Sequence, residues 1–206
     1  MTQDERTGAG PQLTVVPANE ASWEDLQTVF GTRGCAASCQ CQRYKLQPKE
    51  SFAGFPVAER AHRLRQQTDC DHPGAGTTSG LLAHLGTEPV GWCAVEPRTA
   101  YPGLVRNNRV PWTGRDEDKG DGSVWAVPCL FTRVGFRRQG ISRALARAAV
   151  RFARERGARA LEAYPITTRN VISEELHVGT VDTFTAAGLR EVSRPTTRRV
   201  VMRVDF

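Results

Sequence analysis

Apolar side chains recur along the chain with two different periods, which predicts a mixture of strands and helices. Between Trp23 and Phe30 they follow helical spacing, and Asn19 or Ser22 can cap this helix. Three more helices are expected: residues 55–67, with Pro56 near the first turn, residues 141–156, and residues 180–187, which Gly188 ends. The expected strands are short apolar or alternating segments, and they span residues 13–16, 81–85, 90–95, 123–131, 160–164, 189–193 and 199–205.

The segment from residue 123 to 164 has the strongest pattern. An apolar strand runs into a short turn, and a helix with Ile141 and Leu145 on its buried stripe follows at once. The strand at residues 160–164 ends the unit. A strand–helix–strand unit of this kind implies two parallel strands joined by a right-handed crossover.

The length of 206 residues suits one domain with a sizeable core but is short for two. We expect residues 1–11 to be a disordered leader and residues 12–206 to form a single domain. Residues 31–49 and 97–122 show no regular pattern, and connections of about 25 residues, such as the second, are usually functional or mobile. No stretch approaches the roughly 20 apolar residues of a membrane-spanning helix, and the polar N-terminus lacks a signal-peptide core. We therefore expect a cytoplasmic protein without a membrane partner.

The positive charge of the chain is concentrated in one segment. The whole sequence carries a net charge of +6, yet residues 133–159 alone hold nine arginines and one acid, Glu155. A local charge of this kind favours one bound polyanion over a broad nucleic-acid surface. No zinc finger, RNP motif or basic zipper accompanies it, so we expect no nucleic-acid partner.

The loop at the centre of this basic segment reads Arg137-Arg138-Gln139-Gly140-Ile141-Ser142, and it lies between the apolar strand and the long helix. The first N–H groups of a helix have no partners, and the helix dipole is positive there, which suits a pyrophosphate. Gly140 allows the backbone to approach a ligand closely. The Lys-Ser/Thr ending of a nucleoside-triphosphate loop is absent.

This loop resembles the cofactor motif of the GNAT acetyltransferases, Arg/Gln-x-x-Gly-x-Gly/Ala, with Ser142 as a mild departure at the last position. The segment 184–192 is similar to the short helix, glycine and strand near the end of that family. The resemblance covers residues 80–206 well and residues 12–30 loosely. A poorly characterised actinobacterial-type branch is resembled by the elements around Trp92, Trp125, Cys129 and Tyr164-Pro165.

The resemblance implies a GNAT fold, which is an α/β fold with a mixed, twisted sheet of about seven strands and helices on both faces. It also implies an acetyl-CoA-dependent N-acetyltransferase that acetylates a primary amine directly, preferably on a small molecule and otherwise on a protein N-terminus or lysine. A homodimer is possible, since members of the family often dimerise. The residues expected to contact acetyl-CoA are Leu130, Phe131, Thr132, Arg137, Arg138, Gln139, Gly140, Ile141, Ser142 and Arg143.

The catalytic side chains are harder to place. Many members of the family carry a tyrosine four residues before the glycine of the late helix, where it protonates the leaving thiolate, but Phe184 stands there. Tyr164 is a possible substitute. Glu162, on the same strand face, and His177, with a pKa suited to proton transfer, are candidate bases. Glu96, the acids at residues 116–118 and a water chain are further alternatives.

Six cysteines are expected to be thiols, because a secretory signal is absent. Cys35, Cys39 and Cys41 together with Cys70-x-His72 could supply zinc ligands, but their spacing is unlike close Cys-x-x-Cys pairs. Small buried thiols are the preferred interpretation, and no metal site is expected. An acyl-enzyme on Cys129 is conceivable, but burial in its apolar strand would raise the pKa of that thiol.

Two other classes of protein stay open. Phe184 in place of the usual tyrosine would suit a catalytically weak acyl-CoA-binding or sensor protein. The arginine-rich segment would suit a nucleic-acid-binding module, whose affinity should fall steeply with salt and be unaffected by coenzyme A.

Overall fold

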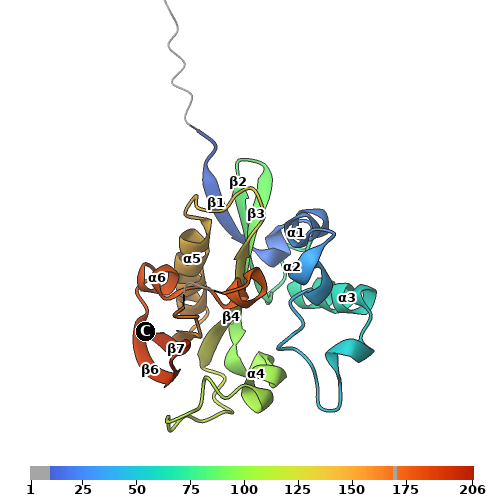
Figure 1. Ribbon diagram of the computed structural model, residues 1–206. Coiled ribbons are helices and arrows are strands. Elements are labelled where there is room, and N and C mark those ends of the chain that lie inside the picture. Colours follow the sequence, from blue (N-terminus) through green and yellow to red (C-terminus); the bar gives the residue numbers. More distant parts are fainter. Residues whose placement is uncertain (1–9, 169–170) are drawn as a thin grey trace, which may run out of the picture.

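A single sheet organises the computed structural model, which describes residues 10–168 and 171–206 (Figure 1). Its strands lie in the order β1-β2-β3-β4-β5-β7-β6, and only β4 and β5 run parallel. The strands are β1 (Leu13–Pro17), β2 (Gly80–Leu85), β3 (Glu88–Pro97), β4 (Val124–Thr132), β5 (Ala160–Ala163), β6 (Arg190–Thr196) and β7 (Arg199–Asp205). This confirms the mixed seven-stranded sheet that the sequence predicted.

Helices cover both faces of the sheet, as expected (Figure 1). The α-helices are α1 (Trp23–Phe30), α2 (Gly34–Cys39), α3 (Val57–Thr68), α4 (Pro102–Asn107), α5 (Ile141–Glu155) and α6 (Val181–Thr185). Short 3-10 segments are η1 (Ala18–Glu20), η2 (Phe52–Gly54), η3 (Arg98–Ala100) and η4 (Ser173–Val178). No helix in the described residues is both long and apolar enough to cross a membrane.

Successive side chains along each strand point to opposite faces of the sheet, and they form one hydrophobic core on each face. Leu81 and Cys93 face α5, whereas the neighbouring Leu82 and Trp92 face α1 and α3. On the α1 side, Ser22 caps the helix by accepting a hydrogen bond from the backbone N–H of Asp25 at 3.0 Å. The apolar faces of α1 and α5, which the sequence pattern indicated, are therefore buried as predicted.

The segments without a regular pattern contain short elements that the sequence did not reveal. Helix α2 lies within residues 31–49, and η3 and α4 lie within residues 97–122. Helices of six residues or fewer show too little periodicity to be recognised. The expected leader, residues 1–11, lies outside the described residues except for Gly10 and Pro11, which are exposed and without regular structure.

Strand β4 loses one neighbour halfway along. Its pairing with β5 ends at Val127 opposite Ala163, while its pairing with β3 continues to Thr132. The register with β3 shifts by one residue near Pro128, which has no N–H to donate to a ladder. The second half of β4 therefore has a free backbone edge on the side where β5 stops.

Candidate active site

The loop before α5 has the geometry of an anion site. Gly140 is the N-cap, with φ of 79°, and Arg138 also has a left-handed φ of 65°. No side chain caps the helix, and its first turn contains no acid. The first N–H groups of α5 are thus free for a ligand, with Arg137 and Arg138 beside them.

A cavity of about 210 Å³ begins at this helix start and follows the end of β4. Its walls come from β4, the basic loop, and the segment from η4 to α6; they are Leu130, Phe131, Thr132, Arg137, Arg138, Ser142, Leu176, Gly179, Thr180 and Thr183. A second hollow of about 280 Å³ adjoins it around Gly140, Ile141 and Arg143. The Thr132 and Ser142 hydroxyls lie 3.0 Å apart and join the strand end to the helix start.

Nine of the ten residues expected to contact acetyl-CoA line these two hollows, and Gln139 does not. Ile141 is only 2% exposed and packs in the core, so its backbone rather than its side chain faces a ligand. The structure therefore gathers the sequence-predicted residues around one continuous surface.

The free edge of β4 forms the floor of the cavity. Backbone N–H groups alternate between the two edges of a strand, and the N–H of Arg133 donates to Val90 on β3 at 2.8 Å. This alternation turns the N–H groups of Leu130 and Thr132 toward the side where β5 is absent. They are donors available to a ligand.

A third cavity of about 500 Å³ lies between the loop after α2 and the β6–β7 turn. It is lined by Arg43, Tyr44, Ile166, Glu175, His177, Thr196, Thr197, Arg198 and Arg199. Its η4 wall adjoins the first cavity, because Leu176 lines one and His177 lines the other. His177 therefore lies next along the chain to a residue of the first cavity.

His177 is paired with Tyr44, a residue that the sequence analysis did not single out. The Tyr44 hydroxyl lies 3.4 Å from Nε2 of His177, and Nδ1 of His177 lies 2.6 Å from the carbonyl oxygen of Glu174. A carbonyl oxygen only accepts, so Nδ1 carries the proton and Nε2 is the acceptor. Burial lowers the pKa of His177, and burial raises the pKa of Tyr44. The pair therefore holds a neutral imidazole beside a protonated phenol.

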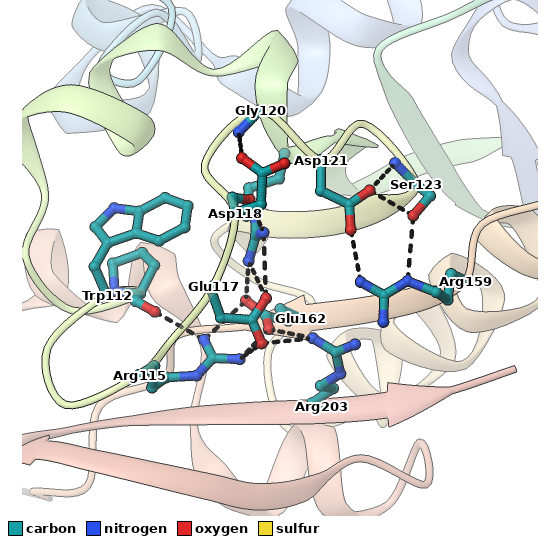
Figure 2. Close-up of polar contacts among 12 residues, drawn as sticks. Trp112, Arg115, Glu117, Asp118, Gly120, Asp121, Ser123, Arg159, Glu162 and Arg203 are labelled. Carbon is teal, nitrogen blue, oxygen red and sulfur yellow. Dashed lines mark hydrogen bonds and ion pairs between the residues drawn. The ribbon is translucent and has the colours of Figure 1, made fainter.

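Glu162 and Tyr164 lie elsewhere. Neither lines the three cavities, and Glu162 is fully buried among Arg98, Arg115 and Arg203 (Figure 2). The hydroxyl of Tyr164 donates to Glu162 at 3.0 Å. Burial alone would raise the pKa of Glu162, but the hydrogen bond and charge of Arg115, with the charge of Arg98, hold it below the ordinary value. An ionised, fully paired carboxylate is a poor base, so this setting favours a structural role for Glu162 and Tyr164 over the proton exchange for which the sequence made them candidates.

The same ion network anchors the long connection before β4. Arg98 donates to the carbonyl oxygen of Asp118 at 2.9 Å, and Glu117 joins Arg115 and Arg203 at 2.9 and 3.3 Å (Figure 2). The ring of Trp112 lies 4.6 Å from the guanidinium of Arg98. Two of the acids that the sequence offered as alternative bases therefore belong to this network. Glu117 joins it through its carboxylate and Asp118 through its backbone carbonyl oxygen.

Glu96 is half-buried and has a different partner. Its carboxylate pairs with Lys45, whose ammonium also lies 4.7 Å from the ring centre of Tyr101. Burial raises the pKa of Glu96 even though Lys45 lowers it. Glu96 stands at the register shift between β3 and β4 and lines none of the three cavities, so only its raised pKa supports it as an alternative base.

Phe184 and the cysteines also have clear places. Phe184 is 1% exposed and packs in the core, and its hydrocarbon ring has no proton to donate.

All six cysteines are free thiols, and the described residues contain no group of three or more His, Cys, Asp or Glu side chains placed to hold a metal ion. Cys70 packs below α1 and donates to Thr68 at 3.2 Å.

Comparisons with known proteins agree with this geometry. The family model described as "Acetyltransferase (GNAT) family" matches residues 44–179, well over half of the chain. No curated protein matches the sequence.

Solved structures share the fold at low sequence identity. An N-acetyltransferase from Staphylococcus aureus Mu50 is 10% identical, with a TM-score of 0.52 over 94% of this chain and 98% of that one. A GNAT-family acetyltransferase from Bacillus anthracis is 8% identical, with a TM-score of 0.53 over 96% of each chain. A ribosomal-protein-alanine N-acetyltransferase from Brucella melitensis is 14% identical, with a TM-score of 0.51 over 94% and 99%. With the family match, the protein belongs to the GNAT acetyltransferase family.

Proposed function

We propose that the protein is an N-acetyltransferase that takes the acetyl group from acetyl-CoA and transfers it directly to a primary amine of a small molecule. The observation that carries this proposal is the uncapped N-terminus of α5 beside Arg137 and Arg138, at one end of a cavity that follows the free edge of β4. Free N–H groups and a positive helix dipole suit a pyrophosphate. The unpaired donors of Leu130 and Thr132 suit the amide-containing arm that follows it.

The protein contributes electrostatic stabilisation through its backbone. When bound, acetyl-CoA supplies a thioester whose carbonyl carbon can accept an amine. The N–H groups on the free edge of β4 can stabilise charge that develops on the carbonyl oxygen. Backbone donors need no particular side chain, so this role does not depend on the missing tyrosine at Phe184.

The third cavity suits an acceptor that carries a negative group. Arg43, Arg198 and Arg199 contribute three positive charges, and Glu175 contributes one negative charge, which pairs with Arg198 at 2.9 Å. The remaining positive charge favours an amine that also bears a carboxylate or phosphate. Arg199 is held in place because its guanidinium donates to the carbonyl oxygen of Tyr164 at 2.7 Å.

Calorimetric titration with acetyl-CoA, followed by an acceptor panel, tests the proposal. We expect a dissociation constant near one micromolar, which corresponds to about 8 kcal/mol. The panel should pair each primary amine with a matched compound that lacks only the negative group, and we expect acetylation of the anionic member to be faster. Binding without transfer to any amine would favour an acyl-CoA-binding or sensor protein. Absence of binding would contradict the proposal.

We infer that His177 accepts the proton of the acceptor ammonium and that Tyr44 protonates the leaving thiolate. His177→Gln and Tyr44→Phe should each lower kcat about 100-fold, as expected for the loss of a general base or acid. Activity requires neutral His177, and its pKa lies below the ordinary 6.5. The rate of the wild-type protein should therefore fall with decreasing pH only below pH 6.5, and His177→Gln should lose this limb of the profile.

The control for this pair is His62→Gln, because His62 is exposed on α3 and away from the cavities. It should leave both kcat and the pH profile unchanged. An unchanged kcat in Tyr44→Phe and His177→Gln would remove both residues from the mechanism and leave Glu96 as the candidate base.

A further inference from the structure

Two cysteines from distant parts of the sequence meet on the α1 side of the sheet. Cys41 follows α2, and Cys129 lies on β4, immediately before Leu130 of the first cavity. Both belong to one apolar cluster, in which Cys129 is buried and Cys41 is half-buried. Neither thiol has a role in the proposed acetyl transfer.

The turn that carries Cys41 is held firmly against the sheet. Gln40 and Cys41 both have left-handed φ values, 47° and 55°, which are unfavourable for residues other than glycine. Their conformation is fixed by buried amides on both sides. The side chain of Gln40 donates to the carbonyl oxygen of Ala37 at 3.0 Å, and that of Gln42 donates to Gln67 at 2.8 Å. The thiol of Cys41 is thus placed by packing.

The surroundings of Cys41 favour its thiolate. The indole N–H of Trp92 donates to its sulfur at 3.3 Å, and the ammonium of Lys45 lies nearby. The neighbouring thiol of Cys129, followed by Trp92 and Lys45, lowers the pKa of Cys41 against the opposing effect of burial. The pKa of Cys129 is raised by Cys41 and by burial. One thiol of the pair is therefore activated while the other stays protonated beside it.

Cys93 and Cys70 give the contrast. Burial raises the pKa of both thiols, and neither has a thiolate-stabilising indole donor. Reactivity of a cysteine toward peroxides and other soft electrophiles follows its thiolate fraction and its accessibility. Cys41 has the favoured thiolate and is half-buried, whereas Cys129 is buried in the apolar cluster against which Cys41 packs.

We propose that Cys41 and Cys129 form a thiol modification site that hydroperoxides oxidise to a disulfide. The thiolate of Cys41 attacks one peroxide oxygen and the O–O bond breaks, so Cys41 becomes a sulfenic acid and hydroxide leaves. The sulfur of Cys129 then attacks the sulfur of Cys41, and the S–O bond breaks as the S–S bond forms. Together the two thiols give up two electrons and two protons, and hydrogen peroxide becomes two waters. A dithiol reductant reverses the modification.

The bond would join two parts of the candidate active site. Cys129 is adjacent to Leu130 on the free edge of β4, and Cys41 precedes Tyr44 by three residues. Oxidation would therefore tie the segment of Tyr44 directly to the strand that lines the first cavity.

The test uses the full-length protein, fully reduced and then freed of reductant. Brief alkylation with iodoacetamide, read out by peptide mass spectrometry, should modify Cys41 at least about tenfold faster than Cys70 or Cys93. A separate sample treated with a small excess of hydrogen peroxide should give a Cys41–Cys129 linked peptide, with four of the six thiols remaining. A dithiol should restore all six.

Variants distinguish this pair from the other cysteines. Cys129→Ser should stop at a sulfenic acid on Cys41, which dimedone traps, and Cys41→Ser should abolish the fast reaction. Cys39→Ser and Cys70→Ser should leave the linked peptide intact. A disulfide between Cys39 and Cys41 instead, or alkylation of Cys41 no faster than that of Cys70 in the wild-type protein, would overturn the proposal.

Discussion

Gly140→Glu should weaken acetyl-CoA binding at least 100-fold, or about 3 kcal/mol in a calorimetric titration. The substitution places a negative charge at the helix start where the proposed pyrophosphate site lies. A Cβ at Gly140 would meet no atom within 4 Å, so the substitution begins in open space. A carboxylate near a helix N-terminus also interacts favourably with the helix dipole, which limits the loss of stability.

Gly157→Glu is the matched control, because Gly157 follows the other end of α5. Its φ of 76° is close to the 79° of Gly140, and a Cβ there also meets nothing within 4 Å. Both variants carry the same strain of a left-handed glutamate. Equal binding by both variants would mean that the loop 137–142 does not hold the cofactor.

Glu162→Ala should lower the free energy of unfolding by about 3–5 kcal/mol, since it removes the fully buried carboxylate that Arg98, Arg115 and Arg203 share and leaves them only the more exposed Glu117. Tyr164 also loses the acceptor of its hydroxyl. Chemical denaturation measures the change. As a control, Glu175→Ala removes the exposed pair with Arg198 and should cost less than about 1 kcal/mol.

The same network gives wild-type stability a defined dependence on pH. The pKa of Glu162 lies below its ordinary 4.5 in the folded protein, so its contribution is fully present above that pH. The contribution is lost as the pH falls through the folded-state pKa. Glu162→Gln should lack this part of the acid dependence. A Gln variant as stable as the wild type at neutral pH would mean that the carboxylate is dispensable.

The cofactor side of the site could be predicted from the sequence because its parts are contiguous. An apolar strand, a basic loop with Gly140 and an amphipathic helix lie within residues 123–156, and local spacing predicts each of them. The sheet followed from the same periodicity. Only elements of a few residues, such as α2 and η4, were missed.

The acceptor side depends on contacts between distant segments. Tyr44 and His177 are 133 positions apart, and Glu162 meets Arg98 across 64 positions. The sequence places Glu162 correctly on a strand and on one face with Tyr164, but it cannot show the guanidinium groups that surround it. Likewise, an apolar strand predicts a raised pKa for Cys129, while the partner thiol of Cys41 becomes visible only in the fold.

The early end of β5 gives the sheet an edge in its interior. Exposed edges usually lie at the rim of a sheet, where they invite pairing with other chains. Here the unpaired half of β4 lines a cavity between the start of α5 and the segment from η4 to α6, away from the rim of the sheet. A narrow ligand with amide groups can complete the ladder there. Its binding would supply hydrogen bonds that the chain leaves unmade, so a bound ligand should also stabilise this half of β4 against local opening.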